Sequence, residues 1–353
     1  MSSCEKVDLK NLGPSVLNEL IASLGKEKYR TSQVLRWLYA VGVGSFDQMT
    51  NLSKGFRREL DRLSFFSNFK PLQTEQAKDG TKKFLFQLMD GNRIESVLIP
   101  DKARLTLCIS TQVGCAMGCQ FCLTGRKGFK RNLTTSEIVN QILAVRSTLS
   151  RNVSMTNIVL MGMGEPLANY DYVLQSLSLM TCRDAFKFSS RRVTLSTVGL
   201  VPEIERLATR NIGFQLAVSL NASNDETRGR LMPVNRRYPL KELLAACTRF
   251  PLRPRARITF EYVLLEGVND SLQDATELVR LLRGIPSKVN LIPLNEAPAI
   301  PFRRPSEAKI RRFQEVLTGS GLTAIVRASK GTEIRAACGQ LEGACQTRSF
   351  CLL

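Results

Sequence analysis

The chain has 353 residues, of which 43% are hydrophobic and 23% are charged, a composition typical of a folded globular protein rather than a disordered one. Fifty Lys and Arg against 31 Asp and Glu leave a net charge of +19, which favours a polyanionic partner such as RNA. The sequence has no apolar run near the roughly 20 residues of a membrane span and no signal-peptide pattern. We therefore predict a cytoplasmic protein without a membrane partner. In that reducing location, its ten cysteines serve metal or redox chemistry rather than a disulfide framework.

The first hundred residues are expected to form an accessory region. Residues 8–66 are predicted to be helical, because stretches such as GPSVLNELIASLG carry apolar residues at spacings of three and four and end at glycine. KKFLFQLMDGNRIESVLIP then has alternating flanks around Asp90-Gly91, a pair typical of a hairpin turn. We predict an N-terminal helical accessory domain over residues 1–66, in contact with RNA, and a β-hairpin linker region over residues 67–100.

From Arg104 onward, short β-rich segments alternate with amphipathic helical segments. The β-rich segments are RLTLCIST, NIVLMGM, RRVTLSTV, FQLAVSLN, ARITFEYVLL and KVNLIPLN, and TAIVRAS is a candidate for one more strand. Such alternation predicts parallel βα units. We expect an α/β fold with a partial (β/α)6 barrel over residues 101–330 and a C-terminal segment over residues 331–353. Functional residues in such a barrel follow the carboxyl ends of the strands.

Three cysteines, Cys115, Cys119 and Cys122, follow the first predicted strand in GCAMGCQFC. Three thiolates can hold three irons of a [4Fe–4S] cluster and leave the fourth iron open to a small ligand. Zinc is the main alternative, but its fourth ligand would have to be Cys108 or a more distant cysteine, because the chain contains no histidine. The CxxxCxxC spacing, with an aromatic residue before the last cysteine, resembles the radical S-adenosylmethionine (radical SAM) superfamily. That resemblance implies that SAM binds the open iron.

Polar residues end several later strands, on the rim where SAM would bind. MGMGEPL supplies Gly164 and Glu165, whose carboxylate suits an ammonium group. The other candidate SAM-binding residues are Ser196, Ser219, Leu220, Asn221 and Asn295. A single Ser or Asn at such a position often only caps a helix or a turn. The prediction therefore depends on the shared position of these residues at one rim of the barrel.

Longer stretches resemble the RlmN/Cfr family of radical SAM RNA methyltransferases over nearly the whole chain. GCAMGCQFCLTGRKGFKRNLT, MGMGEPLAN, VSLNASNDETR, LMPVNRRYPL and AACGQL occur in the order expected of that family. The resemblance implies formation of 2-methyladenosine in the peptidyl-transferase region of 23S rRNA and next to the anticodon in tRNA. It also implies a [4Fe–4S] cluster, two SAM molecules per turnover and a low-potential electron donor of the flavodoxin or ferredoxin type. We expect a monomer.

The same resemblance implies roles for three residues outside the cluster motif. Cys338 matches the cysteine that accepts a methyl group from SAM and then carries the RNA adduct. Cys108 matches the cysteine that attacks the Cys338 sulfur, so that a transient disulfide releases the methylated base. Glu95 matches the proposed base that takes the C2 proton. By residue type alone, Cys338 is typical of a small buried helix-end residue and Glu95 of a strand surface.

One departure from the family concerns Asn221, which stands where the family usually has histidine. Asparagine can donate and accept hydrogen bonds but does not titrate, so a role in positioning SAM is retained and a role in proton transfer is not. Two alternatives stay open at this point: C8 methylation of adenine with the same five cysteines, and a non-catalytic, zinc-stabilised RNA-binding protein. No role is assigned to the remaining cysteines, Cys4, Cys182, Cys247, Cys345 and Cys351.

Basic residues gather in four further stretches of the sequence. These are GRKGFKR, NRRYPLK, RFPLRPRAR and PFRRPSEAKIRR. Several of them fall in predicted loops, where RNA can reach them.

Overall fold

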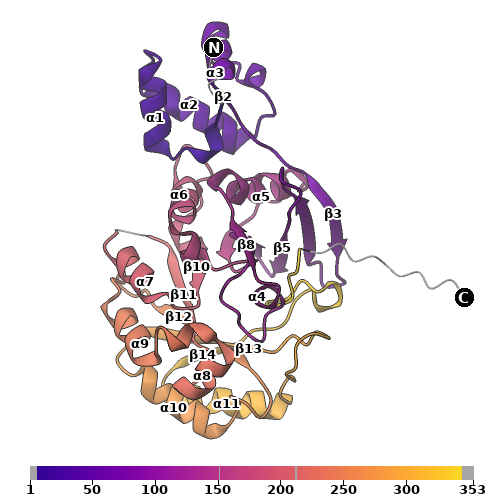
Figure 1. Cartoon of the computed structure of the whole chain (residues 1–353), viewed down its shortest axis with the longest axis vertical. Helices are drawn as coiled ribbons and strands as arrows, with labels where there is room; N and C mark the ends of the chain where they lie inside the picture. Colours follow the sequence, from indigo (N-terminus) through magenta and orange to yellow (C-terminus); the bar gives the residue numbers. More distant parts are fainter. Residues whose placement is uncertain (1–5, 151, 211–212, 344–353) are drawn as a thin grey trace, which may run out of the picture.

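The computed structural model describes residues 6–150, 152–210 and 213–343. One ten-stranded sheet runs through these residues in the order β14-β13-β12-β11-β10-β9-β6-β5-β4-β3 (Figure 1). Its strands from β6 to β14 pair in parallel. They are β6 (Arg104–Cys108), β9 (Asn157–Leu160), β10 (Val193–Thr197), β11 (Gln215–Ser219), β12 (Ile258–Leu264), β13 (Ser287–Pro293) and β14 (Thr323–Val326). The six predicted strands are confirmed, and the TAIVRAS segment supplies the last one.

Helices follow most of these strands and cover the sheet, which confirms the predicted α/β barrel architecture. They are α5 (Thr135–Ser147), α6 (Tyr170–Thr181), α7 (Val201–Ala208), α8 (Asp225–Leu231), α9 (Leu240–Arg249), α10 (Leu272–Leu282) and α11 (Glu307–Gly319). Their packing follows the spacing of apolar residues: α10, for example, buries Ala275, Leu278 and Leu282. No helix in the described ranges is long and apolar enough to cross a membrane.

Three antiparallel strands extend the barrel sheet at the β6 edge. They are β3 (Pro71–Gln76), β4 (Lys82–Gln87) and β5 (Arg93–Asp101). The predicted hairpin corresponds to β4 and β5, and Gly91 in its turn has a φ of 80°. β3 was not predicted as a strand. β5 pairs with β6 so that Val97 lies opposite Cys108, and the hairpin is therefore continuous with the barrel.

The N-terminal region forms a helical unit that lies against α5 and α6 at the top of Figure 1. Its elements are α1 (Pro14–Ser23), α2 (Tyr29–Leu35), a π-helical turn (Arg36–Val41), α3 (Lys54–Leu63) and a short pairing of β1 (Val7–Asp8) with β2 (Ser64–Phe65). Its apolar core includes Val139 and Leu143 of α5. The buried Lys10 donates a 2.8 Å hydrogen bond to Asn140 Oδ1 of the same helix. The proposed domain boundaries at residues 66, 100 and 330 stay predictions.

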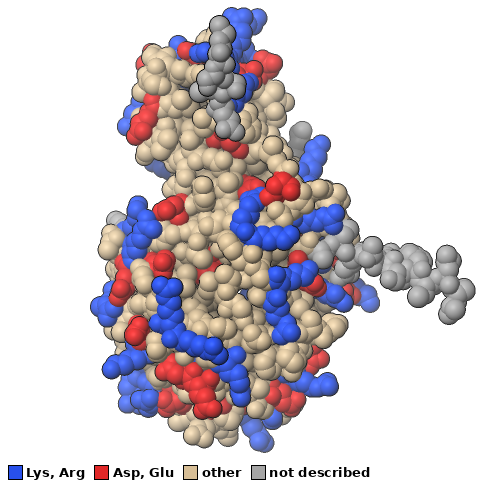
Figure 2. All heavy atoms as spheres, in the orientation of Figure 1, with Lys and Arg blue, Asp and Glu red and all other residues tan. Residues whose placement is uncertain are grey.

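Cationic side chains are spread over the face of the molecule that Figure 2 shows. Figure 2 shows lysine and arginine side chains on both the N-terminal unit and the barrel, with fewer aspartates and glutamates between them. This distribution suits contact with an extended polyanion better than with one small anion.

Candidate active site

The loop with Cys115, Cys119 and Cys122 leaves the barrel between two short strands. These are β7 (Gln112–Gly114) and β8 (Phe129–Asn132), which pair antiparallel. Cys115 N donates to Gly128 O across the base of the loop at 2.9 Å. The loop then packs on α4 (Leu123–Arg126), where a Cβ on Gly125 would lie 3.0 Å from Cys119 N. A tight loop of this kind holds the three thiols beside one another.

The donor set of this loop fits an iron–sulfur cluster. Cys115 and Cys119 are buried and Cys122 is partly buried, and burial is the largest cause that raises the pKa of each thiol, to about 12 for Cys115. Buried thiolates need a strongly positive partner, which the irons of a cluster provide. Each thiolate of a [4Fe–4S] cluster binds a different iron, so the three need not meet at one atom. Within the described ranges, no three Cys, His, Asp or Glu side chains are placed to hold a single metal ion.

A cavity, called here the strand-end cavity, runs from Cys122 across the carboxyl ends of β9 to β13. Among its lining residues are most of the predicted SAM-binding residues: Gly164, Glu165, Ser196, Ser219, Asn221 and Asn295. The structure thus brings together predicted residues from the ends of four strands, β9, β10, β11 and β13. Leu220 is the exception, because it is fully buried and does not line the cavity.

Glu165 is held rigidly in the wall of the strand-end cavity. Its carboxylate accepts hydrogen bonds from Leu167 N at 3.0 Å and from Val198 N at 2.8 Å. Burial nevertheless raises the pKa of Glu165 to about 7, because desolvation outweighs these hydrogen bonds. The preceding Gly164 has a φ of 102°, and a Cβ there would lie 2.6 Å from Gln112 Cβ. An amino group in the cavity would favour the ionised form of Glu165.

The two asparagines of the cavity also have defined partners. Asn221 has a φ of 61°, a left-handed conformation that asparagine tolerates better than most residues. Its Oδ1 accepts from Val263 N at 2.8 Å, which ties the end of β11 to β12. Asn295 Nδ2 donates to the backbone oxygen of Cys338 at 3.3 Å. Asn295 therefore connects the predicted SAM site to the predicted methyl-accepting residue.

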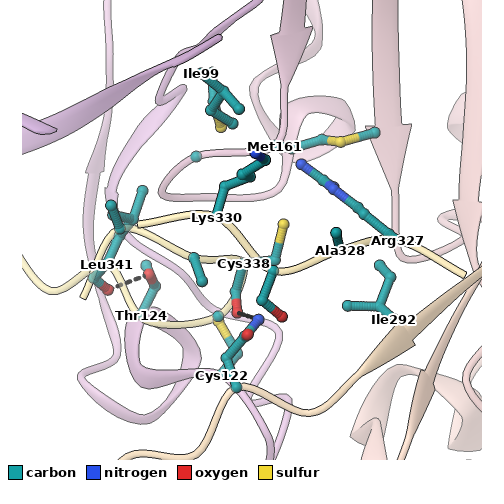
Figure 3. A pocket seen from close by; sticks show the side chains of 17 residues that line it. Ile99, Cys122, Thr124, Met161, Ile292, Arg327, Ala328, Lys330, Cys338 and Leu341 are labelled. Carbon is teal, nitrogen blue, oxygen red and sulfur yellow. Dashed lines mark hydrogen bonds between the residues drawn. The ribbon is translucent and has the colours of Figure 1, made fainter. Parts of the chain in front are cut away.

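A second cavity, called here the cysteine pocket, is lined by both Cys108 and Cys338 and by Cys122. Figure 3 shows Cys338 near its centre. Cys338 also lines the strand-end cavity, so it borders both. The segment that follows it is fixed on α4, because Leu123 N donates to Gly339 O at 2.8 Å.

All described cysteines are free thiols: Cys108, Cys115, Cys119, Cys122, Cys182, Cys247 and Cys338. The disulfide expected between Cys108 and Cys338 is therefore not formed in this structure. Cys4, Cys345 and Cys351 lie outside the described residues.

Arg327 is a residue of the cysteine pocket that the sequence analysis did not identify. Its side chain reaches into the pocket that Cys338 also lines (Figure 3). The charge of a Cys338 thiolate is the largest cause that raises the pKa of Arg327, ahead of Glu261 and Cys108, while burial lowers it. Arg327 directly follows β14, which the sequence indicated only as a candidate strand. Because functional residues follow strand ends in such a barrel, this position was the available signal for Arg327.

Arg228 is a second residue that the sequence did not reveal. It is fully buried, and its guanidinium donates to Leu220 O at 3.0 Å, to Val198 O at 2.7 Å and to Asn235 Oδ1 at 2.9 Å. Burial lowers its pKa to about 10. Arg228 thus fixes the ends of β10 and β11, and Leu220 contributes its backbone rather than its side chain to the site. An arginine in an amphipathic helix gives no sequence signal for such a position, because most are exposed.

Glu95 lines neither cavity. The residue is 2% exposed. One oxygen of its carboxylate accepts hydrogen bonds from Glu342 N at 2.7 Å and from Gly343 N at 2.9 Å. Its other oxygen lies 3.4 Å from Lys83 Nζ. In this structure Glu95 therefore anchors the C-terminal segment, and its role as a proton acceptor stays a prediction.

Family models agree with this arrangement. Residues 109–281 match the model described as the radical SAM superfamily, and residues 7–65 match the ribosomal RNA large subunit methyltransferase N-terminal domain. A partial barrel with a three-cysteine loop after its first parallel strand and a buried glutamate after its second defines a radical SAM enzyme, whose cofactors are a [4Fe–4S] cluster and SAM.

Known proteins narrow the class further. A dual-specificity RNA methyltransferase RlmN of Geotalea uraniireducens is 55% identical over 339 residues, covering 96% of this chain and 97% of that protein. The RlmN of Pelobacter propionicus is 54% identical, with 96% of each chain covered. A crystal structure of a radical SAM methyltransferase from Sphaerobacter thermophilus aligns with a TM-score of 0.89 at 46% identity, over 96% of this chain and 100% of that one. The chain belongs to the RlmN family.

Proposed function

We propose that this protein methylates C2 of adenine in 23S rRNA and in tRNA, with Cys338 as the carrier of the methyl group. The observation that supports this most directly is the position of Cys338 on the border of two cavities. One cavity contains the residues predicted to bind SAM, and the other contains Cys108. A carrier must meet a methyl donor first and a resolving thiol later, and a residue that borders both cavities can meet both.

The cofactors are needed because the C2–H bond of adenine is unreactive. The C2–H of adenine is neither acidic nor nucleophilic, so an ordinary polar transfer of a methyl group to it fails. Bound SAM and the cluster supply the methyl group and the one-electron chemistry that breaks unreactive C–H bonds. Cys115, Cys119 and Cys122 would hold the cluster, and Glu165 and Asn295 are the best-placed polar residues for SAM.

The cysteine pocket gives Cys338 and Cys108 different electrostatic surroundings. Arg327 lines the pocket together with Cys338, and the charge of Cys338 is the largest cause that raises the pKa of Arg327, so Cys338 has a cationic neighbour. Burial, and then the charge of Cys338, raise the pKa of Cys108 to about 12, so Cys108 stays protonated at neutral pH. Cys338 is therefore the thiol that accepts the methyl group, and Cys108 does not compete for it.

Cys108 is placed to act last. Once deprotonated, its sulfur would attack the Cys338 sulfur, forming an S–S bond and breaking the S–C bond; the electron pair leaves on the carbon, which takes up a proton to become the methyl group. A thiol reductant must then reduce the disulfide before the next turnover. Glu95 would accept the C2 proton only after the segment around Glu342 has moved away from it.

Several finer features belong to the same proposal. We infer methylation in the peptidyl-transferase region of 23S rRNA and next to the anticodon in tRNA, electron supply by a flavodoxin- or ferredoxin-type donor, a monomeric enzyme and a cytoplasmic location. The net charge of +19 supports an RNA substrate. C8 methylation would use the same cysteines, but relatives named RlmN favour C2.

Nucleoside mass spectrometry tests the proposal. We expect 2-methyladenosine in 23S rRNA and tRNA from cells that contain the protein and its loss from cells that lack the gene. Recovery of 8-methyladenosine instead would show that the position of methylation is wrong. Unchanged methylation in both RNAs would show that the protein has another function.

A further inference from the structure

A second concave site lies at the opposite end of the barrel from the active site. It is called here the basic hollow, and its cationic lining residues are Arg104, Arg191, Arg192, Arg253, Arg255, Arg257 and Lys288. Arg104 begins β6 and Lys288 lies near the start of β13, so the hollow surrounds the amino-terminal ends of the parallel strands. Three of these arginines belong to the RFPLRPRAR stretch, and they line neither of the active-site cavities.

The charges of the basic hollow are not balanced within the protein. No Asp or Glu lines it, and none of the seven cations forms a salt bridge with a carboxylate in the described part of the chain. Only neutral partners are found: Arg253 donates to Ser190 Oγ at 3.2 Å and Arg257 to Thr323 Oγ1 at 2.7 Å. Like charges gathered in one concave surface repel one another and attract an anion from solution.

The hollow is separate from the catalytic cavities. β12 has seven residues, Ile258–Leu264, with Arg257 just before it at the hollow and Val263 at the strand-end cavity. At about 3.3 Å per residue, Arg257 and Val263 lie on the order of 20 Å apart, although Thr259 of the hollow and Glu261 of the strand-end cavity are close neighbours in β12. The hollow and the strand-end cavity therefore open at opposite ends of the strand. A ligand in the hollow is therefore not the adenine that reacts.

The chemistry of the hollow fits phosphate groups rather than bases. Arginine guanidinium groups bind phosphate oxygens through paired hydrogen bonds. Among the described residues, no aromatic side chain lines the hollow, so these residues offer no stacking surface of the kind that proteins use to bind unpaired bases or free nucleotides. A folded RNA presents a continuous row of phosphates and is long enough to reach both ends of a barrel.

We infer that the basic hollow binds the phosphate backbone of the RNA substrate at a site remote from the methylated adenine. This inference rests on the proposed function. It predicts that the hollow contributes to the binding of a large RNA but not of a short stem-loop that carries the same adenine.

The test removes two charges without disturbing the fold. In the hollow variant, Arg192→Gln is combined with Arg255→Gly; both arginines are exposed, and Arg255 has a φ of 63°, a conformation that suits glycine. The matched control is Arg311→Gln with Arg312→Gln, two exposed residues of α11 outside the hollow. Dissociation constants are measured by filter binding between 50 and 300 mM salt, for a transcribed 23S rRNA fragment and for the stem-loop.

We expect the hollow variant to bind the rRNA fragment about five- to eightfold more weakly per removed cation at 0.1 M salt, and its log–log salt slope to fall by about two. Both variants should bind the stem-loop with the dissociation constant of the wild type, and they should methylate it at the wild-type rate. An rRNA affinity equal to that of the wild type would overturn the inference, as would an equal loss in the control. The inference would also be overturned if inorganic phosphate or an acidic protein bound the wild type more tightly than the hollow variant while the two proteins bound RNA with equal affinity. Failure of the wild type to methylate either RNA would instead contradict the proposed function.

Discussion

The guanidinium of Arg327 and the thiol of Cys338 line the same pocket, which also contains Cys108, and the charge of Cys338 is the largest cause that raises the pKa of Arg327. Cys338 thus has a cationic neighbour, while burial raises the pKa of Cys108 to about 12 and keeps it protonated at neutral pH. The two thiols therefore lie in different electrostatic surroundings before any substrate binds.

Removal of this cation should slow loading of the methyl group on Cys338. We expect Arg327→Gln to lower the rate of S-methylcysteine formation by about tenfold, because the electrostatic attraction between the guanidinium and Cys338 is lost, and about 1.4 kcal/mol of that attraction corresponds to this factor. Mass spectrometry of the C-terminal peptide measures the loading. Lys330→Gln removes a cation from the same pocket and is the control, with near-normal loading. Equal rates in wild type and Arg327→Gln would show that Arg327 does not activate Cys338.

The two cysteines should fail in different ways when they are replaced. Cys338→Ala cannot accept a methyl group, so neither methylated RNA nor a protein–RNA adduct should form. Cys108→Ala should accept the methyl group and attack RNA but not release it, so that a covalent protein–RNA band accumulates on denaturing gels. Normal turnover by Cys108→Ala would rule out the two-cysteine mechanism.

The three cysteines of the loop should be required for the cluster. Anaerobic reconstitution should give about four irons and four sulfides per chain, because three thiolates and SAM complete a [4Fe–4S] site. Replacement of Cys115, Cys119 or Cys122 by Ala should abolish the visible absorbance and SAM cleavage. Cys182→Ala, a free cysteine away from both cavities, should retain both properties. Stoichiometric zinc with full activity would contradict the cluster.

SAM binding should tighten as the pH rises from 6 to 8. Burial raises the pKa of Glu165 to about 7, so the carboxylate is mostly protonated at pH 6 and mostly ionised at pH 8. An amino group of SAM prefers the ionised form, so the affinity should rise by up to about tenfold over this interval. Equilibrium dialysis of the reconstituted protein measures the change. In Glu165→Gln the trend should disappear, and its persistence would assign the titration to another group.

The same shift affects stability in the absence of SAM. A carboxyl group whose folded pKa is raised favours folding below its unfolded pKa, and this contribution is lost as the pH rises through the folded value. The contribution of Glu165 to the unfolding free energy should therefore fall between about pH 4.5 and pH 7. Denaturant titrations of the wild type and Glu165→Gln isolate this contribution.

Glu95 should be needed to hold the C-terminal segment in place. Glu95→Ala removes the acceptor of two backbone N–H groups and one carboxylate beside the buried Lys83, and it should destabilise the fold by about 1–3 kcal/mol. Faster limited proteolysis near Gly343 should accompany this loss. Glu75→Ala removes the other carboxylate near Lys83 and serves as the control, with proteolysis unchanged. If Glu95→Ala is as resistant as the wild type, Glu95 does not anchor the segment.

The local features of the site could be predicted from the sequence because they depend on neighbouring residues. The cysteine spacing of the loop, the Gly164-Glu165 pair and the alternation of strands and helices are all short-range patterns. Parallel strands then bring their carboxyl ends to one rim, so the position of Ser196, Asn221 and Asn295 at strand ends was enough to predict a shared cavity.

Contacts between distant segments were decided only by the tertiary structure. Glu95 and Glu342 are 247 residues apart, and no local pattern indicates that the carboxylate of one holds the backbone of the other. The same is true of Arg228, whose type and helical position predict exposure, although folding buries it against the carbonyl groups of two strands. Sequence thus determined which chemical groups this protein carries and on which strand ends they lie. Packing determined which groups face one another, because burial and hydrogen-bond partners depend on segments that meet only after the chain has folded.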